Sequence, residues 1–153
     1  MTMAGTAAKV EDLTLSITHE LHVKAPLGVT FDALIEQLTE GMVQAGDKPM
    51  PMKIEQWPGG RWWRDLGEGN GHLWAHVQSI KRPVLLEFNG PLMMSFAVTS
   101  NVQYRLSEQD GGTLIKFQHL ALGAVPEGTR NGLMGGWKRI SEWAKERAEK
   151  KSK

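Results

Sequence analysis

Five histidines are the side chains of this sequence best able to carry chemistry near neutral pH, because an imidazole can donate or accept a proton there. His19 and His119 each stand among apolar residues in alternating segments, so we expect both to point into the interior. His72 and His76 flank Trp74 at even spacing, which predicts two imidazoles on one face of a strand. The opposite face, with Leu73, Ala75 and Val77, is aliphatic enough to be the inward one instead. The histidine positions suit a general acid or base, or a group that orients a bound molecule.

Metal and nucleophile chemistry have little support in the sequence. The chain has no cysteine, which excludes thiol catalysis, disulfides and thiolate metal sites. His72 and His76 have no obvious carboxylate beside them to complete a zinc or nickel site, so we expect no metal and no cofactor. No nucleophile elbow, phosphate loop, dinucleotide fingerprint or carboxylate pair is present. The catalytic residues, if there are any, stay unassigned.

Large aromatic side chains are the second notable feature, because four of the six tryptophans fall between Trp57 and Trp74. An aromatic body with a polar tip suits a wall that must be apolar and still orient a ligand. Met93 stands in a turn, where a flexible thioether could adapt to varied apolar molecules. The side chains that we expect to line a ligand cavity are His19, Trp57, Trp62, Trp74, His76, Phe88, Met93, Tyr104, Phe117, His119 and Trp137.

These residues fall on a simple succession of elements. Residues 13–23 alternate as a strand with one buried face, and Pro26 opens an amphipathic helix that ends near Gly41. Residues 41–51 predict a turn or a short second helix. Six further strands, separated by short turns that favour an antiparallel meander, and one long helix complete the chain. Their predicted ranges are 52–57, 61–66, 71–81, 84–89, 96–107 and 113–120 for the strands, and 129–149 for the helix.

Two glycines interrupt the pattern of this long helix. Gly135 and Gly136 each cost about 1 kcal/mol relative to alanine in a helix interior. A close approach of the helix backbone to the sheet, a kink, or a later start of the helix would each explain them. In every case Trp137 lies near the space beneath the helix.

Composition limits the classes of protein that this chain can represent. With 153 residues, 41% hydrophobic, the chain is expected to form one domain over residues 10–149, with disordered ends at 1–9 and 150–153. The net charge of +1 and the mixed signs of the basic tail do not indicate a nucleic-acid partner. No apolar run indicates a membrane segment or a secretory signal, so we expect a cytoplasmic protein.

Several short motifs occur in an informative order along the chain. They are Pro26 at the first helix, Pro58-Gly59-Gly60-Arg61, Trp74-Ala75-His76-Val77, Lys81-Arg82-Pro83, Gly111-Gly112-Thr113, and Gly136-Trp137 in the last helix. With them the chain resembles the helix-grip superfamily of START and Bet v 1-like domains, often called SRPBCC. Within that superfamily it resembles the group named after the activator of the heat shock protein 90 ATPase. The resemblance extends from about Leu13 to Ala148.

The resemblance implies an α+β, helix-grip fold, in which a curved antiparallel seven-stranded sheet (β-α-β6-α) wraps around the long C-terminal helix. It also implies a hydrophobic cavity between sheet and helix, which in relatives holds lipids, polyketides, hormones or other apolar molecules. Our first hypothesis is therefore the binding of a small hydrophobic or aromatic molecule in that cavity. The alternatives are a cyclase or dehydratase that uses a cavity histidine, and an interaction module that contacts a chaperone.

Overall fold

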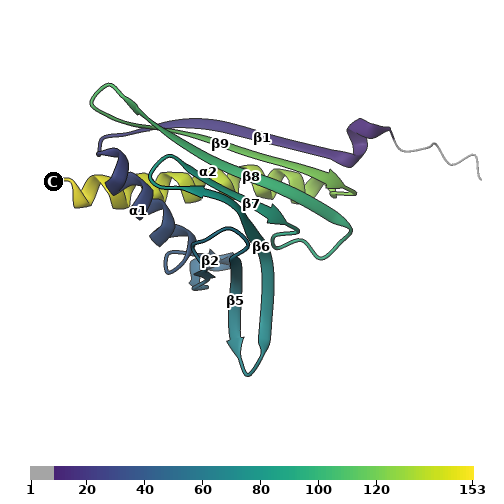
Figure 1. Cartoon of the computed structure of the whole chain (residues 1–153). Coiled ribbons are helices and arrows are strands. Elements are labelled where there is room, and N and C mark those ends of the chain that lie inside the picture. The colour runs from purple at the N-terminus through teal and green to yellow at the C-terminus, as the bar shows by residue number, and fades with distance from the viewer. Residues whose placement is uncertain (1–8) are drawn as a thin grey trace, which may run out of the picture.

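A curved antiparallel sheet wrapped around one long helix forms the body of the protein (Figure 1). The computed structural model describes residues 9–153. The long helix is α2 (Glu127–Lys151), and a shorter helix, α1 (Leu27–Leu38), packs against its C-terminal half. This arrangement confirms the α+β, helix-grip fold that the sequence predicts.

The sheet has seven strands in the order β1-β9-β8-β7-β6-β5-β4, and all neighbours are antiparallel. The first strand in the sequence, at residues 14–23, pairs with the last, at residues 112–123. Both were predicted as strands from the alternation of residues 13–23 and 113–120. The strands are β1 (Thr14–Val23), β4 (Lys53–Ile54), β5 (Arg61–Gly67), β6 (Asn70–Lys81), β7 (Leu85–Gly90), β8 (Val98–Gln109) and β9 (Gly112–Gly123).

The register of β1 and β9 places the two interior histidines on one side of the sheet. Ile17 lies opposite His119, and His19 lies opposite Phe117. His119 is fully buried and His19 is half-buried, because the concave face of the sheet receives α2. The inward orientation predicted for both imidazoles is therefore confirmed.

The opposite face of the sheet is polar. Amide and carboxylate side chains on neighbouring strands form a ladder, in which Asn101 donates to Glu87 and Asn89, and Gln103 donates to Glu87. Cross-strand hydrogen bonds of this kind let the outer face remain in water while the inner face packs. The sheet is therefore one-sided, and α2 supplies the layer that covers its apolar face.

The ends of the elements differ from the sequence prediction in three places. Residues 41–51 form neither a simple turn nor a second α-helix, but a two-stranded ribbon of β2 (Val43–Gln44) and β3 (Lys48–Pro49) joined by a short 3-10 turn, η2 (Ala45–Asp47). A backbone hydrogen bond of 2.8 Å from Met50 N to Met42 O closes this ribbon. We call residues 42–50 the β2–β3 segment.

The other two differences concern lengths. The strand predicted at 52–57 is reduced to β4, and α2 starts at Glu127 and continues to Lys151, into the expected C-terminal tail. A short 3-10 helix, η1 (Val10–Leu13), precedes β1, and residues 1–8 of the expected N-terminal tail lie outside the described residues. Within residues 9–153, neither helix combines the length and the hydropathy needed to cross a membrane.

A β-bulge in β6 changes the orientation predicted for His76. Trp62 lies opposite Ala75, but Trp63 lies opposite Leu73, so Trp74 is an extra residue in the ladder. Trp74 and Ala75 are consequently both buried, and the alternation reverses beyond them. The two imidazoles that a regular strand would place on one face are therefore on opposite faces, and His76 is exposed.

Candidate ligand pocket

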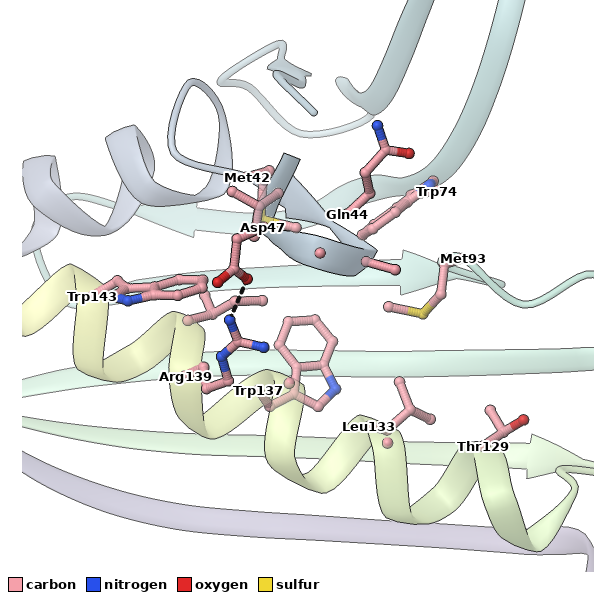
Figure 2. A pocket seen from close by; sticks show the side chains of 16 residues that line it. Met42, Gln44, Asp47, Trp74, Met93, Thr129, Leu133, Trp137, Arg139 and Trp143 are labelled. Carbon is pink, nitrogen blue, oxygen red and sulfur yellow. Dashed lines mark hydrogen bonds and ion pairs between the residues drawn. The ribbon is translucent and has the colours of Figure 1, made fainter. Parts of the chain in front are cut away.

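An apolar pocket of about 390 Å³ lies along one face of α2 (Figure 2). The face of α2 forms one wall, and the β2–β3 segment, Trp74 of β6 and Met93 of the β7–β8 connection form the other. The helix residues recur at three- and four-residue spacing, which puts them on one side of the helix. They are Thr129, Gly132, Leu133, Gly136, Trp137, Ile140 and Trp143, with Arg139 beside them.

Two glycines form part of this wall. A Cβ placed on Gly132 or Gly136 would meet no other side chain or backbone segment within 4 Å, so neither glycine is needed for a close approach to the sheet. The helix starts at Glu127, well before both residues, so a late start does not explain them either. Gly132 and Gly136 leave open the space that larger side chains would fill. Nothing in the structure explains Gly135, which does not line the pocket.

Trp137 joins the pocket to the core beneath it. Its side chain lines the pocket but is only 2% exposed, because the sheet covers the rest of the indole. The indole Nε1–H donates to His119 Nδ1 at 2.9 Å, and His119 Nε2 lies 2.8 Å from Ser100 Oγ. Since Nδ1 accepts, the neutral ring carries its proton on Nε2 and donates it to Ser100. Burial lowers the pKa of His119 to about 4, which keeps the ring neutral near pH 7.

His19 belongs to a second buried polar group, nearer the C-terminal half of α2. Its Nε2 lies 2.8 Å from Ser141 Oγ, and its ring stacks on Phe117 at 4.6 Å. Burial lowers the pKa of His19, repulsion from Lys138 lowers it further, and Glu142 opposes both effects. A serine bound to a histidine is the arrangement of an activated nucleophile. Here, however, Ser141 is 1% exposed and neither residue lines the pocket.

Four of the predicted site residues pack as core rather than as pocket wall. Trp62 stacks on Phe88 at 4.7 Å, and its indole Nε1–H donates to Leu38 O at the end of α1. Tyr104 contacts Phe117 at 5.0 Å, and its fully buried hydroxyl has no hydrogen-bond partner among the described residues. Burial raises the pKa of Tyr104 well above its usual value. The space directly beneath α2 is therefore filled by side chains, and the pocket lies to one side of it.

Two predicted site residues lie outside this region. Trp57 is 57% exposed, in the connection that follows the shortened β4, so it is not a cavity wall. His76 is exposed because of the bulge at Trp74. Of the eleven residues expected at a ligand site, the structure brings together Trp74, Met93 and Trp137 around the pocket.

The charged residues of the pocket were not identified from the sequence. Arg139 Nη2 donates to Asp47 Oδ1 at 2.5 Å, so the ion pair connects α2 to the β2–β3 segment. The Arg139 guanidinium also lies over the ring of Trp143, 4.7 Å from its centroid. The spacing of Gly132, Gly136, Arg139 and Trp143 on one helix was a usable signal, but the sequence could not show what faces them. Within residues 9–153, no three acidic or histidine side chains are grouped so as to hold a metal ion.

Comparison with known proteins identifies the fold of this chain through similar solved structures. No protein family model matches the sequence, and no curated protein matches it. Ara h 8.0201 superposes with a TM-score of 0.67 at 14% identity, over 88% of this chain and 97% of that one. CalU16 from Micromonospora echinospora superposes with a TM-score of 0.61 at 20% identity, and the match covers 84% of this chain and 71% of CalU16.

A third similar structure is the di-domain ARO/CYC StfQ from the steffimycin biosynthetic pathway. Its TM-score is 0.62 at 13% identity, and the match covers 94% of this chain but 52% of that protein. Identities this low establish the shared fold and leave activity open. The narrower resemblance, to the group named after the activator of the heat shock protein 90 ATPase, stays a prediction.

Proposed function

We propose that this protein binds one small, mainly apolar molecule in the pocket between α2 and the β2–β3 segment. The pocket volume of about 390 Å³ is in the range of known small-molecule sites, roughly 300–1,000 Å³. Trp143 offers a partly exposed apolar ring, Trp74 and Trp137 close the wall with the small uncovered parts of their indoles, and Met93 offers an adaptable surface. The walls therefore suit an aromatic or alicyclic body better than a polar one.

The pair Gly132 and Gly136 is the observation that carries this proposal. Each glycine in the interior of α2 lowers helix stability by about 1 kcal/mol relative to alanine. Packing does not require either of them, because an added Cβ would meet nothing. Both line the pocket, so a side chain at either position would occupy the ligand's space, whereas Gly135 has equally open surroundings away from the pocket.

The cyclase or dehydratase alternative would need an imidazole on the pocket wall. His119 reaches the pocket only through the indole of Trp137, and His19 faces Ser141. Both histidines are therefore better explained as groups that hold buried side chains in place. We do not favour an enzyme on this geometry.

Filling the pocket from the helix tests the proposal. The probe is 2-naphthylacetamide, a neutral aromatic compound, used with a panel of neutral apolar compounds in titration calorimetry and tryptophan fluorescence. We expect Gly136→Leu to weaken binding at least tenfold, because the new side chain enters the pocket. Gly135→Leu is the matched control: it makes the same substitution one residue away, where an added Cβ also meets nothing but does not face the pocket.

Both variants should be as stable as the wild type or more stable, because leucine is a better helix former than glycine. Loss of binding in Gly136→Leu therefore cannot come from unfolding, which thermal melts verify. The proposal fails if no compound in the panel binds the wild-type protein, or if Gly136→Leu binds as tightly as Gly135→Leu.

A further inference from the structure

We infer that the ligand of this pocket carries a carboxylate or a similar anionic group, and that Arg139 binds it. The inference rests on the proposed function and adds the chemical class of the ligand. The side chains that line the pocket include two with a charge, Arg139 and Asp47, and both stand at the same end of it (Figure 2). The apolar body of a ligand would lie against Trp137 and Trp74, with its charged end toward this pair.

Arg139 is prepared for such a contact. Its side chain is 53% exposed, and among the described residues its hydrogen bonding is limited to one bond, from Nη2 to Asp47. A guanidinium has five N–H donors in a planar fork, so Nε and Nη1 remain free for a second acceptor. The contact of the guanidinium with the ring of Trp143 restricts the Arg139 side chain, so less side-chain freedom is lost when an anion binds.

Asp47 occupies the place of an exchangeable partner. The side chain of Asp47 is 67% exposed, and its backbone lies in a turn with a φ of 56°. Arg139, in contrast, lies in the middle of the long helix α2. A ligand carboxylate could use the free nitrogens of the fork or replace Asp47 on it. A cationic ligand directed to Asp47 would face the guanidinium of Arg139 at close range, whereas an anionic ligand would meet the donors of that guanidinium that Asp47 does not use.

A pair of probes with the same skeleton separates charge from shape. We would compare 2-naphthylacetate with 2-naphthylacetamide by titration calorimetry, at neutral pH and constant ionic strength. For the wild type we expect the acid to bind about tenfold more tightly than the amide, as a charge-assisted hydrogen bond at a partly exposed site would give. Asp47→Asn should increase the affinity for the acid further, because it removes the competing carboxylate.

Arg139→Gln is the decisive variant. We expect it to remove the preference for the acid and to leave the affinity for the amide within about twofold of the wild type. Lys138→Gln is the matched control, because it removes the same charge from the adjacent helix position, which does not line the pocket. It should keep the preference.

Each other outcome decides against the inference. Equal affinity of the wild type for acid and amide would show that the charged end is not recognised, while the apolar pocket would stand. Loss of amide binding in Arg139→Gln would show that Arg139 keeps the pocket in shape and does not bind the anionic group of the ligand. If neither probe binds the wild type while another neutral compound of the panel does, this inference fails and the proposed function stands. If no compound of the panel binds either, the proposed function fails together with this inference.

Discussion

At the scale of single residues, His119 is a structural group and not a free base. It accepts from Trp137 and donates to Ser100, so both ring nitrogens are engaged in holding neighbours. Protonation would put a hydrogen on Nδ1, where the indole N–H already points, and would charge a fully buried ring. The orientation of Trp137 in the pocket wall therefore depends on a neutral His119.

This role predicts a specific dependence of stability on pH. Burial lowers the pKa of His119 from 6.5 to about 4, so between these values the unfolded chain binds the proton and the folded chain does not. Stability is then complete above about pH 6.5 and falls as the pH decreases toward 4, by roughly 3 kcal/mol from this residue. His19, whose pKa is lowered too, adds to the same trend.

Urea denaturation from pH 4 to 7.5 measures this trend. We expect His119→Gln to be less stable than the wild type at pH 7.5 but to lose distinctly less stability on acidification, because glutamine does not titrate. A slope as steep as that of the wild type would mean that other groups cause the acid sensitivity.

At the scale of elements, the bulge in β6 is fixed by its contact with β7. Leu92 N donates to Trp74 O at 2.8 Å, and the backbone of Gly90 passes directly beside the bulge. A Cβ on Gly90 would lie 2.3 Å from Trp74 O and 2.6 Å from Ala75 Cα. The absence of a side chain at Gly90 therefore lets the bulge turn Trp74 inward, toward the pocket.

Gly90→Ala should consequently destabilise the protein, by about 1–3 kcal/mol, since backbone atoms must move to admit the methyl group. Gly28→Ala is the control, because a Cβ in this first turn of α1 meets nothing within 4 Å, and we expect it to be neutral or stabilising. Urea melts compare the two. Equal stabilities would show that β6 and β7 can separate without cost.

At the scale of the whole molecule, stability is unevenly distributed. The sheet and α2 bury one continuous core, but the hairpin of β5 and β6 extends beyond it (Figure 1). Residues 64–73 of this hairpin are largely exposed, including Leu66 at 54% and Leu73 at 46%. A two-stranded ribbon with little packing is marginally stable in water.

Hydrogen exchange should therefore separate the two regions. We expect amides of residues 64–72 to exchange at least a hundredfold faster than those of β8 and β9 near Tyr104 and Phe117, which lie in the middle of the sheet. Exchange followed by mass spectrometry or NMR reports both regions in one sample. Equal protection would indicate that another surface covers the hairpin in solution.

The sequence alone determined the order of the two helices and the seven strands of the main sheet, and the buried side of the first and last strands. It did so because apolar periodicity is a local property: residues 13–23 and 113–120 alternate whatever they pair with, and the last helix shows its stripe without its partner. His19, His119 and Trp137 were placed correctly in the interior for this reason.

Tertiary structure decided where the pocket lies. The bulge at Trp74 arises from pairing between strands, so counting by two along β6 could not show that His72 and His76 lie on opposite faces. The β2–β3 segment folds over α2 from almost a hundred positions away in the chain, and it brings Asp47 to Arg139. Contacts between distant segments leave no periodic trace in the sequence, so the helix face was predictable while its partner was not.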